Sequence, residues 1–187
     1  MKTRGLLLAL VVAGTAPAAA QVPGLDIDLR IGANSTSFSE TPVEFEDRNA
    51  NTNYFVGGDI RFGGLFFIQP GLYYQKQGFE FEGDAEGNDQ SIGISSFMIP
   101  VQVGVNLDIP LIALEMAAGP TVTFNTESDN LPKEELNNTR FGALVSAKID
   151  VLFIGAWVGY QWDFTDTSDG GFDGHMSQWM VGIGINF

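Results

Sequence analysis

Apolar and polar residues alternate along most of this chain with a period of two, which is the period of a β-strand and not of a helix. In residues 25–33, every odd position is apolar, whereas the residues between them are Asp26, Asp28, Arg30 and Gly32. Such a segment has one apolar and one polar face only when it is extended. The chain is therefore expected to form a sheet with two chemically different faces.

The same alternation returns in seven further segments. They cover residues 53–62, 66–75, 99–108, 113–124, 139–150, 154–162 and 179–187. Short breaks such as Gly63-Gly64 and Asp108-Ile109-Pro110 separate some of them, as expected of tight turns. The hydrophobic content of 44%, with 12% aromatic residues and 23 glycines, also favours β structure. We predict an all-β fold of about eight antiparallel strands.

The connections between these segments alternate in length. The long ones cover residues 36–52, 78–93, 125–138 and 165–176, and the others span only a few residues. In an up-and-down arrangement, all the long loops then lie at one end. Sixteen of the 23 acidic residues fall in them: Glu40, Glu44, Glu46, Asp47, Glu80, Glu82, Asp84, Glu86, Asp89, Glu127, Asp129, Glu134, Glu135, Asp166, Asp169 and Asp173. One rim is predicted to be strongly negative.

The first twenty residues are expected to be a secretory signal peptide. Lys2 and Arg4 precede an apolar run at residues 6–13, and three alanines at 18–20 stand before Gln21. Cleavage after Ala20 leaves a barrel domain over residues 21–187. Removing the two cations changes the net charge from −14 to −16, which makes nucleic acid an unfavourable partner. No later stretch is long and apolar enough for a transmembrane helix, and the absence of cysteine excludes disulfides.

Two closed barrels fit this pattern. In a soluble, lipocalin-like barrel, the apolar face lines a ligand cavity, which here would include Val101, Val103, Ile183 and Ile185. In an outer-membrane barrel, the apolar face points outward to lipid, the turns at one end are short and the loops at the other are long. The loop pattern favours the second arrangement: a closed antiparallel up-and-down transmembrane β-barrel of about eight strands.

The polar face carries glycines and charges of both signs. Its charged members are Asp26, Asp28, Arg30, Asp59, Arg61, Glu115, Lys148 and Asp150. In a soluble barrel these are solvated surface groups, whereas in an eight-stranded membrane barrel they fill the lumen with ion pairs and hydrogen bonds. Aromatic residues near strand ends support the membrane arrangement, because interfacial belts lie there. They are Tyr54, Phe62, Tyr74, Phe124, Tyr160, Trp162 and Trp179.

Three segments resemble the PorT-like outer-membrane β-barrel domain family, which comprises small eight-stranded bacterial barrels. "FFIQPGLYYQKQGF" (residues 66–79) is similar to the third strand of that family. "MIPVQVGVNL" (98–107) and "EMAAGPTVTF" (115–124) are similar to its next two strands. The resemblance covers essentially the whole chain after the signal peptide. It implies a bacterial outer-membrane location and the barrel fold more than any activity.

No catalytic, cofactor-binding or metal-binding residue is assigned. His175, the only histidine, stands near Asp173 and Ser177, but proximity in sequence does not make a catalytic triad. Residues 82–89 and 166–174 combine carboxylates and glycines as calcium loops do, yet neither matches an EF-hand. We expect a protein that is not an enzyme, with at most diffuse binding of divalent cations at its acidic loops.

The final segment, "WMVGIGINF", places Trp179, Val181, Ile183 and Ile185 on one face and ends at Phe187. A last strand of this kind, with a C-terminal aromatic residue, resembles the signal read by the barrel insertion machinery. The chain is therefore expected to be a monomeric outer-membrane barrel with both termini in the periplasm, acidic extracellular loops and a structural or interaction role. A narrow porin-like pore and the secreted lipocalin-like binding barrel are the alternatives.

Overall fold

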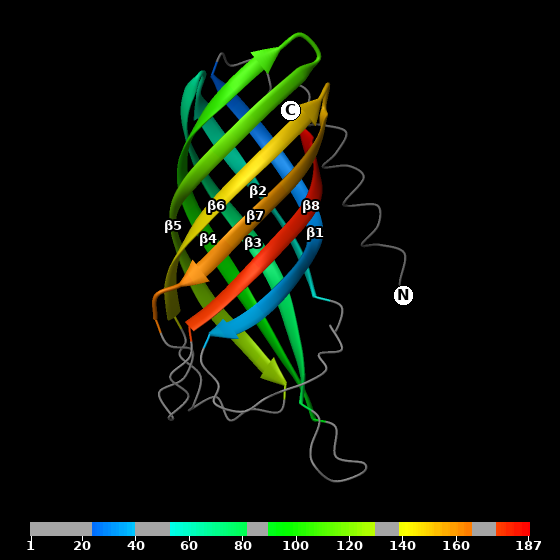
Figure 1. Ribbon diagram of the computed structural model, residues 1–187, viewed down its shortest axis with the longest axis vertical. Coiled ribbons are helices and arrows are strands. Elements are labelled where there is room, and N and C mark those ends of the chain that lie inside the picture. The colour runs from blue at the N-terminus through cyan, green and yellow to red at the C-terminus, as the bar shows by residue number, and fades with distance from the viewer. Residues whose placement is uncertain (1–23, 40–52, 82–89, 130–138, 166–174) are drawn as a thin grey trace, which may run out of the picture.

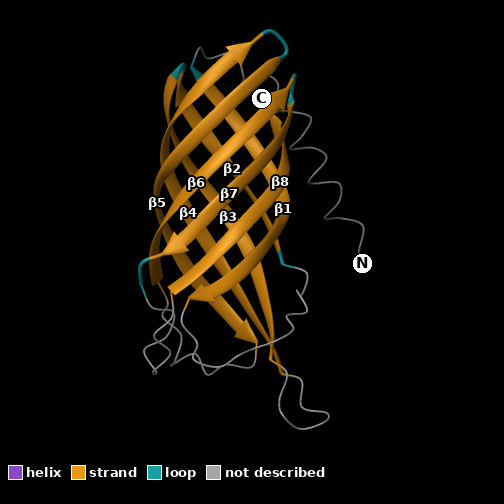
Figure 2. Ribbon diagram, in the orientation of Figure 1, coloured by secondary structure: helices purple, strands orange, loops and turns teal. Residues whose placement is uncertain are grey.

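A computed structural model describes residues 24–39, 53–81, 90–129, 139–165 and 175–187, which form a single closed β-barrel (Figure 1). Figure 2 shows that the described residues are strands joined by short turns. The strands are β1 (Leu25–Ser39), β2 (Tyr54–Gly63), β3 (Phe66–Phe81), β4 (Gln90–Ile109), β5 (Ile112–Asp129), β6 (Thr139–Val151), β7 (Ile154–Asp163) and β8 (His175–Asn186). Within these ranges, no helix is long and apolar enough to cross a membrane.

Each strand pairs antiparallel with the next, and β8 pairs back with β1, so the order around the barrel is the order in the sequence. The closing ladder is long, from Asp28 opposite Asn186 to Ser39 opposite His175. Beyond its last strand residue, Phe187 still exchanges two backbone hydrogen bonds with Ile27, at 2.9 and 3.1 Å. The predicted eight-stranded, up-and-down antiparallel barrel is confirmed.

The barrel has a turn end and a loop end. At the turn end, strands are joined by the short turns at residues 64–65, 110–111 and 152–153, and the chain finishes there at Phe187. The loop end, at the bottom of Figure 1, carries the four longer connections.

The long connections are shorter than the sequence predicts. β1 continues to Ser39, β3 to Phe81 and β5 to Asp129, while β4 already begins at Gln90. Glu80, Glu127 and Asp129 therefore belong to strands and not to loops. These extensions do not keep the apolar alternation, but a backbone ladder can continue without it once the neighbouring strand is in place. The remaining acidic loop residues lie outside the described residues.

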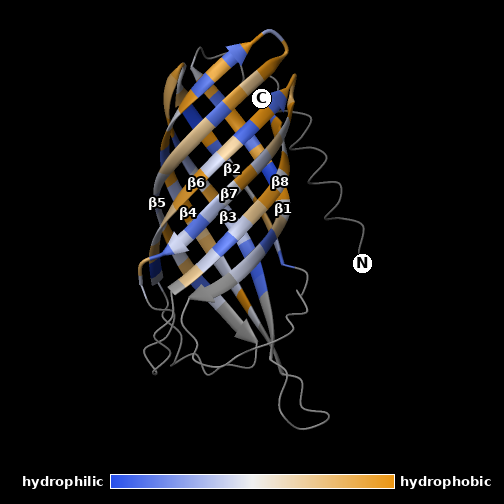
Figure 3. Cartoon of the chain, viewed as in Figure 1, coloured by the Kyte–Doolittle hydropathy of each residue, from blue (hydrophilic) through white to orange (hydrophobic). Residues whose placement is uncertain are grey.

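Apolar side chains cover the outside of the barrel and polar ones face the lumen, which produces the alternating colours along the strands in Figure 3. Val103 is 62% exposed and Ile183 is 63% exposed, and Val101 and Ile185 also lie on the outer face. The alternative of a lipocalin-like barrel, in which these four residues would line a ligand cavity, is therefore wrong. The apolar face is the outer face.

Two of the short turns place leucine in the left-handed backbone region. Leu111 has φ of 74° and Leu152 has φ of 61°. This conformation costs a residue other than glycine about 1–2 kcal/mol, and turns of this kind ordinarily use glycine or asparagine there. Complete removal of a leucine side chain from water stabilises by about 1.5–3 kcal/mol, which is enough to offset that cost. Leucine at these two positions is therefore energetically favourable only if its side chain is removed from water.

The outward position of the apolar face predicts the effect of Val103→Arg. Val103 lies midway along the outward residues of β4, between Phe97 and Ile109, so a charge there meets the centre of the hydrocarbon. We expect a loss of about 2–4 kcal/mol in the free energy of unfolding, measured by urea titration in lipid vesicles. Thr126→Arg, at an exposed position of the loop end, is the control and should change stability by less than about 1 kcal/mol. Equal effects of the two variants would contradict this placement.

Candidate functional site

The lumen holds most of the buried polar chemistry of the described residues. From the turn end to the loop end, its side chains form three successive groups: ion pairs, a largely apolar aromatic group and a network of amides. An eight-stranded barrel is just wide enough for side chains to fill, so each group reaches across the interior. We call these groups the charge layer, the aromatic layer and the amide layer.

The charge layer lies at the turn end. Its five carboxylates and three cations are Asp26, Asp28, Asp59, Glu115, Asp150, Arg30, Arg61 and Lys148. Five negative and three positive charges leave a formal charge of −2. All are buried except Asp26 and Arg61, which are partly exposed. The predicted packing of these eight residues in the lumen is confirmed.

Lys148 of β6 is the centre of this layer. Its Nζ forms an ion pair with Asp28 across the barrel, and lies 3.1 Å from Asp150 Oδ2 and 3.6 Å from Glu115 Oε2. Arg30 also reaches Asp28, through Nη2 at 2.9 Å. The ammonium group therefore holds together carboxylates from three strands, β1, β5 and β6.

A second part of the charge layer links β2 to β5. Arg61 Nη1 donates to Glu115 Oε2 at 2.9 Å, and Arg61 Nη2 donates to Asp26 Oδ2 at 2.5 Å. The same guanidinium lies over the ring of Phe67, 5.6 Å from its centroid. The Arg61–Glu115 ion pair joins two strands that are not neighbours, so it ties β2 to β5 across the lumen, whereas Asp26 and Phe67 lie on the strands beside β2.

The aromatic layer crosses the middle of the lumen. The rings of Tyr73 and Trp157, from opposite strands β3 and β7, stack with centroids 6.4 Å apart, and Phe55 meets both edge-on. Met98 and Met180 pack into the same cluster. The hydroxyl of Tyr73 donates to Asp59, which connects this layer to the charge layer. Bulky side chains thus fill the lumen at its midpoint.

The amide layer lies nearer the loop end, and Gln178 is its centre. Gln178 Nε2 donates to Gln75 Oε1 at 2.9 Å and to Gln161 Oε1 at 2.6 Å. Its Oε1 accepts from Gln77 at 2.6 Å and from Asn34 at 3.2 Å. The network fixes side chains of β1, β3, β7 and β8 in one arrangement.

A buried ion pair between Arg140 and Asp163 completes this layer. Arg140 Nη1 donates to Asp163 Oδ2 at 2.9 Å, and Gln161 Nε2 donates to the other oxygen of Asp163 at 2.8 Å. The carboxylate is thus held by groups from β6 and β7. The loop end of the lumen is therefore polar but also closely linked.

Sequence reasoning found the charged residues and missed the other two layers. Phe55, Tyr73 and Trp157 are aromatic residues on the polar face, so alternation alone gives no role to them. A usable signal was present, because Gly32 and Gly182 stand on the same face and leave room for a large ring. A Cβ atom at either glycine would lie 2.6 to 2.8 Å from the ring of Phe55.

Most of the residues considered for catalysis and metal binding lie outside the described residues. Ser177 lies half-buried on β8 opposite Trp162, whereas Asp173 and the side chain of His175 lie outside the described residues. Both candidate calcium loops, residues 82–89 and 166–174, also lie outside them. Within the part of the chain that the structure describes, no group of three acidic or histidine side chains could hold a metal ion.

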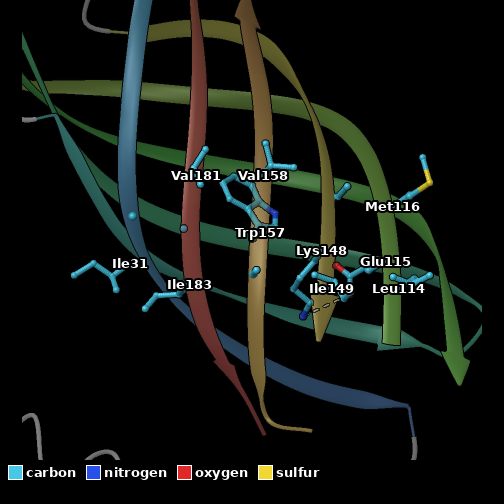
Figure 4. Close-up of a pocket in the computed structure, with 14 residues that line it drawn as sticks. Ile31, Leu114, Glu115, Met116, Lys148, Ile149, Trp157, Val158, Val181 and Ile183 are labelled. Carbon is cyan, nitrogen blue, oxygen red and sulfur yellow. Dashed lines mark ion pairs between the residues drawn. The ribbon is translucent and has the colours of Figure 1, made fainter. Parts of the chain in front are cut away.

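An open hollow of about 750 Å³ lies beside β1 and β5–β8 (Figure 4). Most of its lining consists of exposed apolar side chains, including Met116, Val158, Val181 and Ile183. Lys148 and Glu115 border it from the lumen side while their charged groups are paired with each other. The hollow is part of the apolar outer surface and suits hydrocarbon better than a polar ligand.

The barrel geometry agrees with comparisons to known proteins. The family profile described as "Outer membrane protein beta-barrel domain" matches residues 19–187. The chain belongs to this family. The barrel is therefore a bacterial outer-membrane protein embedded in the lipid bilayer, as its apolar outer face requires.

Three solved structures are similar to the barrel at low sequence identity, and the first of them shares its fold. Neisserial surface protein A aligns with a TM-score of 0.54 and 9% identity, over 88% of this chain and 97% of that one. Ail, the attachment invasion locus protein of Yersinia pestis, solved with the heparin analogue sucrose octasulfate, gives 0.46 and 15%, over 87% and 99%. The N-terminal β-barrel domain of Pseudomonas aeruginosa OprF gives 0.44 and 13%, over 87% and 96%. No curated protein sequence matches the chain.

The central position of Lys148 predicts a large effect of Lys148→Met. The substitution leaves Asp28, Glu115 and Asp150 buried without their shared cation, which costs about 3–5 kcal/mol in comparable buried ion pairs. The measurement is urea unfolding in vesicles, followed by tryptophan fluorescence. Lys76→Met, on the outer face of β3, is the matched control and should cost less than about 1 kcal/mol. A loss for Lys148→Met as small as that of the control would show that the charge layer does not stabilise the barrel.

Proposed function

We propose that this outer-membrane barrel has a structural or interaction role at the cell surface, and that the role is carried by its loop end. The observation that supports this most directly is the filled lumen, in which Tyr73 and Trp157 meet from opposite walls. A lumen of this kind favours neither a porin-like pore nor a ligand-binding cavity. The remaining surfaces are the lipid-facing band and the two ends.

The proposed orientation places the short turns and both termini in the periplasm and the acidic loops outside. Short periplasmic turns and long external loops are the usual arrangement of outer-membrane barrels. The strands β3, β4 and β5 extend furthest at the loop end, as the lower part of Figure 1 shows. In this orientation they present a small, backbone-paired surface above the membrane, which supports an interaction role.

Several finer assignments belong to the same proposal. The chain is of the PorT-like type, is made with a signal peptide over residues 1–20, and acts as a monomer without catalytic activity. Its acidic loops attract divalent cations diffusely, because closely spaced carboxylates outside the membrane concentrate counterions. The sequence similarity to PorT-like strands and the charge distribution support these assignments. The signal peptide lies outside the described residues.

The orientation is tested with single cysteines, since the natural chain has none. Thr126→Cys places a thiol at the loop end, and Asp108→Cys places one at the mouth of the turn end, both at exposed positions. A polymer-linked maleimide too large for outer-membrane pores should label Thr126→Cys on intact cells and Asp108→Cys only after permeabilisation. Labelling of Asp108→Cys alone, or of neither variant, on intact cells would overturn the proposed surface role.

Recognition of the last strand by the insertion machinery predicts the effect of deleting Phe187. Deletion removes two backbone hydrogen bonds to Ile27, so stability in detergent should fall by only about 1–3 kcal/mol. The amount of folded barrel in the membrane should fall several-fold, measured by heat-modifiable gel migration of membrane fractions. Phe187→Leu, the control, keeps the backbone bonds and should reduce membrane levels without loss of stability. Unchanged membrane levels in both variants would contradict a role of Phe187 in insertion.

A further inference from the structure

The turn end of the barrel carries exposed apolar side chains at the tip of every short turn. Leu111 is 71% exposed and Leu152 is 66% exposed, and Leu65 and Phe153 are exposed beside them. Each tip continues the apolar outer face of its strands without a polar break on that face. The two left-handed leucines hold these side chains outward at a conformational cost. Something other than water is therefore expected around them.

The backbone at these tips is bonded within the protein. The carbonyl of Leu65 accepts from the amide of Asn106 at 2.9 Å, and that of Leu111 accepts from Leu152 at 3.2 Å. The carbonyl of Phe153 accepts from the amide of Asn186 at 3.0 Å. A turn in water does not need such bonds, whereas a turn in a water-poor environment does.

Aromatic residues differ between the two ends. The chain has four tyrosines and three tryptophans, of which Tyr73 and Trp157 are in the lumen. All the others lie on the outer face towards the loop end: Tyr54, Tyr74, Tyr160, Trp162 and Trp179. Rings with a polar group mark the boundary with water. The outward rings near the turn end are phenylalanines, which suit a deeper position.

Distances along β5 lead to the same placement. Its outward apolar residues run from Ile112, next to the turn, to Phe124 near the loop end. At about 3.3 Å per residue and a tilt of about 35–45°, this run covers about 28–33 Å along the barrel axis. The apolar band of such barrels is about 25 Å tall. If this run is centred on the band, it passes each boundary by only about 2–4 Å, so Ile112 and the adjoining turn at residues 110–111 lie at the level of the headgroups and not in bulk water.

We propose that the three turn tips are seated in the headgroup–acyl boundary of the bilayer, so that lipid is the partner of this surface. The surface is continuous with the lipid-facing band. The carboxylates of Asp26 and Asp150 at the turn end pair with cations in the lumen, and Asp108 lies on the lumen side of β4, where it accepts a hydrogen bond from Asn106. The barrel is thereby displaced towards its loop end, and the extensions of β3–β5 stand clear of the membrane. The identification of this leaflet as the periplasmic one rests on the proposed orientation. The depth of the turn tips in the bilayer does not rest on it.

The depth is measured with single cysteines at Leu111 and Leu152, each carrying an environment-sensitive fluorophore, in barrels refolded into phosphatidylethanolamine–phosphatidylglycerol vesicles. Thr126→Cys is the aqueous reference and Val103→Cys is the mid-band reference. Aqueous iodide should quench both tip labels at least three-fold less than the label at residue 126. A nitroxide near the lipid headgroup should quench them more than a nitroxide deep in the chain, with the reverse order at residue 103.

Iodide quenching of the tip labels equal to that at residue 126 would overturn the proposal. If such water-accessible tips were nevertheless protected from a small maleimide in permeabilised cells, a periplasmic protein, and not lipid, would cover them. With iodide on both sides of the vesicle membrane, these measurements do not depend on which end faces outward. Reversed labelling of the cysteines at 108 and 126 on intact cells would therefore disprove the proposed orientation without affecting the depth.

The double variant Leu111→Asn/Leu152→Asn provides a second test, in which the direction of the change in the urea midpoint decides the outcome. Asparagine tolerates the left-handed conformation, so relief of backbone strain alone would raise the urea midpoint of unfolding in vesicles. Loss of contact with lipid should instead lower it. A raised midpoint would overturn the proposal. Leu107→Asn, on the outer face of β4, is the reference variant and gives the decrease in midpoint expected for a residue in lipid.

Discussion

The whole structure depends on one constraint. Every backbone amide and carbonyl inside the bilayer must form its hydrogen bond within the protein, because hydrocarbon offers no partner. In hydrocarbon each unpaired amide or carbonyl costs several kcal/mol, so a sheet can span the membrane only if it has no free edge. Here the ladder between β1 and β8 meets that need. Even beyond β8, Phe187 continues the pairing with Ile27. Closure then makes the barrel interior a separate compartment, which side chains must fill.

Side chains from opposite walls fill the interior of this barrel. Ion pairs around Lys148, stacked rings at mid-height and amides around Gln178 all connect strands across the lumen. Glycines on the inner face allow this, since Gly32 and Gly182 leave the space that Phe55 occupies. A lumen used for cohesion leaves the ends and the outer surface as the places where the protein can meet partners. The proposed roles of the loop end and of the lipid-seated turns both follow from that division.

Strand assignment from sequence succeeded wherever one face is apolar. The run of residues 25–33 keeps its pattern because every second side chain must face lipid, and β1 begins at Leu25 as expected. The extension of β1 to Ser39 was missed because polar residues such as Ser35 and Thr36 carry no alternation. Backbone pairing with β8 decides their conformation instead. Most of the acidic loop residues lie outside the described residues, so their place at one rim of the barrel stays a prediction from the sequence.

By itself, the sequence determined that the chain forms about eight strands, that their two faces differ, and that long acidic connections alternate with short ones. These properties follow from local periodicity, which needs no knowledge of distant contacts. The loop lengths favoured an outward apolar face, but only the tertiary structure established that Val103 and Ile183 face outward, and only it showed that Tyr73 and Trp157 stack across the lumen. The physical reason is that a period of two defines two faces but not which one is inside. Closure and the volume of the lumen make that choice.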